Sequence, residues 1–329
     1  MTDDNGVVTT EAFAPGGAVS FVRVRTGGNS VYRFDARTIE TVFSIEAEDV
    51  IEVGGTDRYS EFPTAGRLEA NLSGPPTGGA FQDVAVSCGG RRLVGGGSGI
   101  GRAIAIAFAD RGAGVFIVGR REAPLRETAA ERPEAIEWQM ADVTVANDAK
   151  RIVEAAVERF GRLDVLVNNA ADGVMRPLAD TDDVTMDRLV AVNFTSPLRM
   201  AREALPHLDR TKGQVVNMGS TTANVALPGT TIYSATKAAL NQATRVLAAE
   251  LGPAGIRVNL IAPGPTETDA ARSALDQSPP GMAEQMIAQS PFRRLGIPED
   301  VAKAVLMVTG DDAGWITGQI INASGGFMS

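Results

Sequence analysis

The feature that most constrains the fold is a regular alternation of short apolar runs and amphipathic stretches that begins near residue 91. We expect short strands at Leu93–Val94, Val115–Val118, Val165–Val167, Gln214–Asn217 and Val258–Ile261. The segments between them have helical periodicity, notably Ala146–Phe160, Met186–Leu205 and Tyr233–Leu251. Strands that alternate with helices of this length form a parallel sheet with helices on both faces. We therefore predict a doubly wound α/β fold for residues 87–329.

The first 86 residues have a different pattern. They contain 13 acidic and 6 basic residues, a net charge of −7, while the whole chain carries −9. Short alternating runs bounded by turn residues predict antiparallel strands at Val19–Val24, Val31–Phe34, Val42–Ile45 and Val50–Val53. Residues 63–80 are rich in proline and glycine, which is typical of a linker. We expect residues 1–86 to be a small β-rich appendage of unknown function; a partly disordered acidic extension is the alternative.

The composition excludes several classes of function. With one cysteine, Cys88, and one histidine, His207, we expect no intrachain disulfide and no metal site. His207 is interpreted as a partly exposed residue near a helix end. The negative net charge disfavours binding to nucleic acid or to anionic membranes. No targeting segment and no apolar run of membrane-spanning length is recognised, so we expect a soluble cytoplasmic protein.

A glycine-rich loop follows the first expected strand of the α/β part. Its sequence is Gly-Gly-Gly-Ser-Gly-Ile-Gly over residues 95–101, and an apolar helix begins there. Glycines let the backbone approach a pyrophosphate, and the helix N-terminus supplies free N–H groups. A plain tight turn is the alternative for such a loop when it is considered alone.

Two arginines follow the second strand, where a dinucleotide fold often has an acidic residue. Arg120 and Arg121 could hold a 2′-phosphate, so NADP(H) is expected rather than NAD(H), the alternative being two solvated surface arginines. Asp142 ends the next strand, near the place where adenine would bind.

Tyr233 and Lys237 form the most specific pattern. The chain has only three tyrosines, and the spacing of four places both side chains on one helix face. A neighbouring cation is expected to lower the pKa of the phenol, whose ordinary value is about 10. The phenol would then serve as a proton donor or base for a ketone or alcohol. Ser220 follows an apolar strand and could hold the substrate oxygen, while Asn193 lies within an expected helix, where an amide is unfavourable without a polar role.

These motifs together resemble the short-chain dehydrogenase/reductase family, and the 3-oxoacyl-reductase-like ketoreductases within it, over residues 91–329. The matching strings are GGGSGIG, NNA, NF, NMGS, YSATK, PGPTET and WITGQ. The resemblance implies a Rossmann-like fold, a small carbonyl or alcohol substrate and a homo-oligomer, either a tetramer or a dimer. It also implies that Asn193, Ser220, Tyr233 and Lys237 are catalytic. The cofactor positions that it implies, together with the two arginines, are Gly95, Gly97, Ser98, Gly99, Ile100, Gly101, Arg120, Arg121, Asp142, Val143, Asn169, Ala170, Tyr233, Lys237, Pro263, Gly264, Thr266 and Thr268.

One departure from the family pattern concerns the glycine-rich loop. The family's threonine before the first loop glycine is Val94 here, so a hydrogen bond that ties the loop to the strand carrying Asn168 and Asn169 is expected to be absent. We predict an NADP(H)-dependent ketoreductase. The alternatives are an enoyl- or dienoyl-thioester reductase on the same scaffold and a catalytically silent binding or assembly protein. The substrate segment is expected within Glu267–Phe292, as two short helical pieces.

Overall fold

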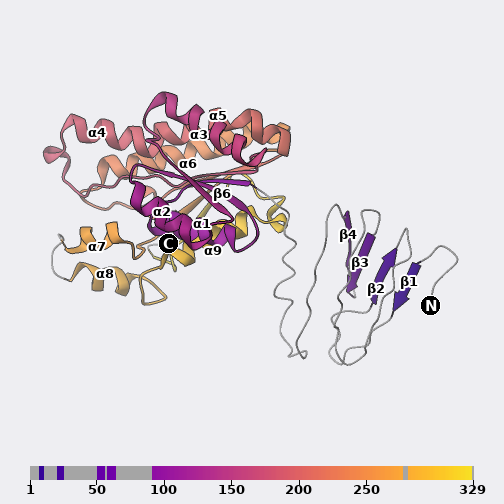
Figure 1. Cartoon of the computed structure of the whole chain (residues 1–329). Coiled ribbons are helices and arrows are strands. Elements are labelled where there is room, and N and C mark those ends of the chain that lie inside the picture. The colour runs from indigo at the N-terminus through magenta and orange to yellow at the C-terminus, as the bar shows by residue number, and fades with distance from the viewer. Residues whose placement is uncertain are drawn as a thin grey trace. The chain divides into compact units, whose positions relative to one another are not determined.

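The chain divides into two compact units, Met1–Val86 and Ser87–Ser329 (Figure 1). The computed structural model describes residues 7–10, 21–25, 50–55, 58–63, 91–276 and 281–327. Within these residues, no helix is both long enough and apolar enough to cross a membrane.

The described part of the first unit is an antiparallel sheet with strand order β1-β2-β3-β4. The strands are β1 (Val7–Thr10), β2 (Phe21–Arg25), β3 (Val50–Gly55) and β4 (Arg58–Pro63). Strands β2 and β3 fall where the alternation at Val19–Val24 and Val50–Val53 predicts them, while β1 and β4 were not predicted. The expected strands at Val31–Phe34 and Val42–Ile45, and the linker after residue 63, lie outside the described residues.

The second unit contains a parallel sheet of order β11-β10-β9-β8-β5-β6-β7. Its strands are β5 (Arg91–Gly95), β6 (Gly114–Gly119), β7 (Ile136–Met140), β8 (Val165–Asn168), β9 (Gln214–Met218), β10 (Arg257–Pro263) and β11 (Ile320–Ala323). The predicted doubly wound fold is confirmed. Strand β5 is paired on both sides, and the strand order reverses between β5 and β8, so ligands are expected at the carboxyl ends of these strands.

Helices cover both faces of this sheet (Figure 1). One face carries α1 (Gly99–Ala109), α2 (Glu122–Glu131) and α9 (Pro298–Thr309), and the other carries α3 (Ala146–Phe160), α5 (Ser196–Thr211) and α6 (Thr231–Leu251). Three shorter helices are α4 (Asp183–Val190), α7 (Asp269–Asp276) and α8 (Met282–Gln289). Short 3₁₀ turns occur at Leu178–Asp180, Thr221–Ala223, Gly252–Ala254 and Asp311–Ala313.

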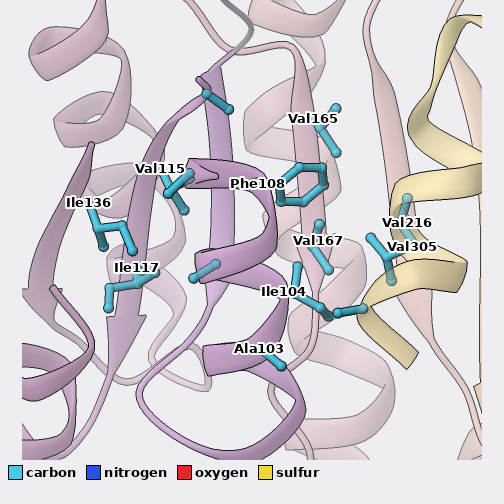
Figure 2. Packing of buried hydrophobic residues seen from close by; sticks show 14 of the residues in the cluster. Ala103, Ile104, Phe108, Val115, Ile117, Ile136, Val165, Val167, Val216 and Val305 are labelled. Atoms are coloured by element: carbon cyan, nitrogen blue, oxygen red, sulfur yellow. The ribbon is translucent and has the colours of Figure 1, made fainter. Parts of the chain in front are cut away.

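The core between α1, α9 and the sheet is built from fully buried apolar side chains. Figure 2 shows Ile104 and Phe108 of α1 beside Val165 and Val167 of β8, with Val305 of α9 close by. Each of these residues is at most 2% exposed. Burial of this kind stabilises a fold by about 1.5–3 kcal/mol for each large side chain. The rigid sheet therefore gives the strand ends fixed positions, on which the candidate site is built.

The helix predicted over Met186–Leu205 is present and contains a π-helical turn. Its backbone is α4, a π-helical turn over Ala191–Thr195 and then α5. Pro197 has no N–H group, so the carbonyl of Asn193, four residues earlier, lacks its α-helical donor. The N–H of Ser196 donates to the carbonyl of Ala191, five residues back. The predicted helix is therefore continuous, and the missing donor of the proline accounts for the π-helical turn within it.

We propose that residues 87–329 fold and bind cofactor without residues 1–86, because the second unit has its own sheet and core. A shortened chain that begins at Phe81 is expected to unfold cooperatively and to bind NADPH within about twofold of the full chain, since an α/β domain of this size buries enough surface to be stable alone. Thermal unfolding and fluorescence titration, with the full chain as control, test this. A shortened chain that aggregates or fails to bind NADPH contradicts it.

Candidate active site

The glycine-rich loop connects β5 to α1 with very little space around it. A Cβ atom added at Gly101 would lie 2.0 Å from the Gly95 carbonyl oxygen, so no side chain fits at that position. Gly99 opens α1 with a φ of 53°, in the region that glycine adopts most readily. The first turn of α1 carries no acidic residue, and its N-cap, Ser98, makes no side-chain cap. The helix therefore presents uncapped N–H groups, which suit a phosphate group.

The loop is held against β8 by an amide that follows that strand. Asn169 Nδ2 donates to the Gly95 carbonyl oxygen at 2.6 Å. A Cβ atom at Gly95 would lie 3.0 Å from the backbone nitrogen of Ala170, which shows how closely the two segments approach. The departure at Val94 led us to expect a missing bond between the loop and this strand. Asn169 provides a tie of its own between the same two segments.

The two arginines follow directly after β6, whose Val118 lines the cavity at the strand ends. Arg120 and Arg121 are both exposed, and within the described residues neither forms an ion pair with a carboxylate at 4.0 Å or less. Arg121 Nη2 donates to Ser98 Oγ at 3.4 Å, so it reaches the start of α1. Burial raises the pKa of Asp142, but hydrogen bonds from Thr144 and the charge of Arg120 outweigh it, and the net shift is downward.

A cavity lies at the carboxyl ends of β5, β6 and β8. Its lining includes Gly95, Val118, Val143, Asn169 and Ala170. The expected cofactor positions Val143, Asn169 and Ala170 are thus brought together around one space. Gly97 and Ile100 attach the loop to the rest of the domain. The Gly97 carbonyl oxygen accepts from Thr128 Oγ1 at 3.4 Å, and Ile100 packs against the core.

The segment after β10 contacts the glycine-rich loop on the side away from β8. Gly264 donates its backbone N–H to the carbonyl of Ala323 at 3.1 Å, and Thr266 Oγ1 donates to the Gly264 carbonyl at 2.9 Å. The methyl group of Thr268 lies 3.1 Å from where a Cβ atom of Gly99 would be. The segment that starts at Pro263 therefore meets the beginning of α1. Beyond it, α7 and α8 are the two short helices expected within Glu267–Phe292.

Ser220, Tyr233 and Lys237 meet at the end of β9. Ser220 is 8% exposed and lies close enough to the Tyr233 side chain for its hydroxyl to lower the pKa of the phenol, and its Oγ accepts from Thr222 Oγ1 at 2.9 Å. Lys237 is 2% exposed, and its Nζ donates to the Met218 carbonyl at 2.8 Å. The same Nζ lies 5.8 Å from the centroid of the Tyr233 ring. A phenol, a hydroxyl and a cation on neighbouring elements can hold an oxygen and transfer a proton to it.

The pKa of Tyr233 differs from the expectation. Burial raises the pKa of this phenol above its ordinary value of 10.0, and the neighbouring Ser220 hydroxyl opposes the shift only in part. Burial also lowers the pKa of Lys237 to about 8. Because desolvation of the phenol dominates, Tyr233 is a neutral proton donor at neutral pH in this structure, whereas the spacing alone led us to expect a lowered pKa.

Asn193 is fully buried in the π-helical turn. Its Nδ2 donates to the backbone carbonyl of Asp172 at 2.8 Å, and its Oδ1 accepts from the backbone N–H of the same residue at 3.0 Å. Within the described residues, no direct hydrogen bond joins Asn193 to Lys237. The Asn193 amide thus makes the polar contacts that its place in a helix led us to expect. Its partner is the backbone of Asp172, in the loop after β8.

A buried chain of polar side chains lies behind these groups and was not predicted. Asn168 Nδ2 donates to Asn217 Oδ1 at 2.9 Å, and Asn217 Nδ2 donates to Thr244 Oγ1 at 2.9 Å. All three residues are at most 8% exposed. The signal that could have identified Asn217 is an amide in an otherwise apolar strand, since a buried amide needs partners.

The free energy of unfolding is expected to depend on pH through Lys237. Its pKa is about 8 in the folded chain and near the ordinary 10.5 when unfolded, so the unfolded chain binds more protons between these values. Stability therefore rises with pH, by roughly 1.5 kcal/mol from pH 8 to 9.5 for this group. Urea unfolding at several pH values should show this rise in the wild type and lose it in Lys237→Met. The exposed Lys150→Met variant is the matched control and should keep the wild-type slope.

Comparison with known proteins extends these observations. A family model described as enoyl-(acyl carrier protein) reductase matches residues 95–328. An uncharacterized oxidoreductase of Thermotoga maritima is 38% identical over 239 residues, covering 71% of this chain and 95% of the relative. The 2-(S)-hydroxypropyl-CoM dehydrogenase 3 of Xanthobacter autotrophicus is 36% identical over 249 residues, covering 72% and 95%.

A solved structure described as ElxO with NADP bound is also similar. Its TM-score is 0.67 at 29% sequence identity, and the match covers 73% of this chain and 98% of that one. The family model spans more than half of the chain, and the curated relatives are matched over nearly their whole length. The chain therefore belongs to the short-chain dehydrogenase/reductase family of oxidoreductases.

Proposed function

We propose that this protein is an NADP(H)-dependent reductase of ketones. The observation that carries the proposal is the group formed by Ser220, Tyr233 and Lys237, in which burial keeps the phenol protonated. A neutral phenol beside a hydroxyl suits proton donation to a carbonyl oxygen. Because burial raises the pKa of Tyr233, the phenol is protonated at neutral pH, which is the form that reduction of a carbonyl requires.

The residues around the glycine-rich loop fit a dinucleotide. The space that a Cβ atom at Gly101 would fill, the uncapped N-terminus of α1 and the cavity beside Ala170 suit a phosphate and the groups next to it. Asp142 and Val143 would hold the adenine end. The segment Pro263–Thr268 and the Lys237 ammonium would hold the nicotinamide end. When bound, the nicotinamide supplies a hydride.

The protein's own groups manage the proton and the oxygen. The Ser220 hydroxyl would donate a hydrogen bond to the substrate oxygen and orient it toward Tyr233. The Tyr233 hydroxyl would then give its proton to that oxygen as the carbonyl is reduced. Lys237 carries a positive charge at neutral pH, since its pKa is about 8, and this charge favours the phenolate that remains. Asn193 would support the return of a proton from solvent.

The preference for NADP(H) is supported by Arg120 and Arg121. Both guanidinium groups are exposed, and within the described residues neither forms an ion pair with a carboxylate at 4.0 Å or less, although the charge of Arg120 acts on Asp142. They are therefore available to a 2′-phosphate. The similar structure described as ElxO with NADP bound supports the same cofactor.

Reduction of an enoyl thioester is the second candidate, because the matching family model carries that description. The Ser220 hydroxyl beside the Tyr233 phenol favours a carbonyl oxygen as the acceptor instead. NADPH consumption with a panel of ketones and a parallel panel of enoyl thioesters distinguishes the two. Turnover confined to the enoyl thioesters would overturn the ketoreductase proposal, and turnover of neither panel at saturating NADPH would count against both.

Replacement of Tyr233 by Phe is expected to lower kcat for ketone reduction by ~10²–10⁴-fold, the usual contribution of a general acid. The ring and its packing remain, so the dissociation constant for NADPH should stay within about twofold by fluorescence titration. Unchanged turnover in Tyr233→Phe would rule out the assigned proton donor.

Replacement of both Arg120 and Arg121 by Ala should reduce the ratio of kcat/KM for NADPH to that for NADH by at least about tenfold, since a charge-assisted hydrogen bond contributes about 1.5–3 kcal/mol. Arg126→Ala is the matched control, because Arg126 is an exposed arginine of α2 that pairs with Glu122. If both cofactors lose activity equally, the two arginines only shape the loop.

A further inference from the structure

We propose that the ion pair between Asp172 and Arg188 is a positioning device for the active-site loop Asn169–Arg176, and that Arg188 is a positioning residue for the reaction. The idea rests on the proposed function, because it assigns the ion pair an effect on turnover. Asp172 lies between the cofactor positions after β8 and the segment that faces Tyr233. A small displacement of Asp172 would therefore move both the cofactor positions and the segment that faces Tyr233.

The backbone of Asp172 is held by Asn193 at two points. The amide side chain of Asn193 accepts from the Asp172 N–H at 3.0 Å and donates to the Asp172 carbonyl at 2.8 Å. This reciprocal pairing fixes the orientation of the amide, since a flipped amide would place donor against donor and acceptor against acceptor. A displacement of Asp172 therefore weakens or breaks these two hydrogen bonds.

The side chain of Asp172 is held from a second direction. Its Oδ2 accepts a hydrogen bond from Arg188 Nη1, in an ion pair whose side chains are 21% and 45% exposed. Arg188 lies in the last turn of α4, five residues before Asn193 in the same continuous helical stretch. One helical segment therefore contacts Asp172 both at its backbone and at its carboxylate.

The loop on either side of Asp172 touches the reacting groups. On one side, Asn169 ties the loop to Gly95, and Ala170 lines the cavity expected for the cofactor. On the other side, a Cβ atom added at Gly173 would lie 3.8 Å from Cε2 of the Tyr233 ring. A loop anchored at Asp172 thus sets the distance between the cofactor side of the crevice and the ring that carries the proton donor.

Hydrogen exchange tests the anchoring without any assay of activity. The amide hydrogen of Asp172 is bonded to Asn193, so its exchange rate reports whether the pairing holds. In the full chain, Arg188→Ala is expected to speed exchange within residues 169–176 by about fivefold, equivalent to about 1 kcal/mol and near the upper end for a partly exposed ion pair. Arg188→Lys keeps the charge and should restore most of the protection.

Steady-state kinetics test the effect on the reaction. Arg188→Ala and Asp172→Asn are each expected to lower kcat by about fivefold while KM for the ketone stays within about twofold. The double variant should lose no more than either single variant, because both remove the same contact. The matched control is the Asp110–Arg132 ion pair, which is 2.5 Å long with side chains 48% and 40% exposed and joins the ends of α1 and α2. Arg132→Ala should change neither kcat nor exchange at residues 169–176.

The outcomes separate the inference from the proposed function. Unchanged exchange in Arg188→Ala overturns the positioning role, whether or not the enzyme turns over ketones. Faster exchange with kcat within twofold of the wild type shows a purely structural ion pair and also overturns the proposal. A wild type that reduces no ketone refutes the proposed function by itself, and the exchange experiment then still decides whether Arg188 anchors the loop.

Discussion

The arrangement of the site depends on one buried ammonium group. Lys237 is 2% exposed, and within the described residues its Nζ donates only to the Met218 carbonyl. Burial of a cation is unfavourable unless other groups compensate it, which is why the pKa of Lys237 falls to about 8. An ammonium has three donors, so two remain for oxygens of molecules that enter the crevice. Desolvation of the Lys237 ammonium therefore lowers the stability of the fold while no ligand is bound. It also strengthens the hydrogen bonds that the ammonium can donate to a polyhydroxylated ligand.

The fold keeps Lys237 in place through contacts that are themselves polar and buried. Asn217, one residue before Met218, links β8 through Asn168 to α6 through Thr244. Thr244 lies seven residues after Lys237, which places both on the same face of α6. A rotation of α6 that moved the ammonium would also break the hydrogen bond from Asn217, leaving a buried amide without its partner, at a cost of about 1–3 kcal/mol. This hydrogen bond thus fixes the rotation of α6 relative to β9, and with it the position of the Lys237 ammonium.

Much of the fold could be predicted because local patterns determine it. The sheet followed from apolar runs at helix-length spacing, and the glycine-rich loop from its position after a strand. The π-helical turn at Asn193 could not be predicted from periodicity, because Pro197 removes one donor without changing the apolar pattern. The pairing of Asp172 with Arg188 and the raised pKa of Tyr233 were likewise missed. Both depend on tertiary packing: a contact between a loop and a helix in one case, and desolvation of a side chain in the other.

The strand ends explain why the departure at Val94 leaves the loop attached. β5 and β8 are hydrogen-bonded neighbours, so the residues that follow them emerge side by side at the same edge of the sheet. Asn169, the first residue after β8, needs only its short side chain to reach the Gly95 carbonyl at 2.6 Å. The absence of a Cβ atom at Gly101 keeps that carbonyl accessible to Asn169, so the glycine is needed for this hydrogen bond. The tie therefore depends on the parallel pairing of two strands, and a single residue before the loop does not control it.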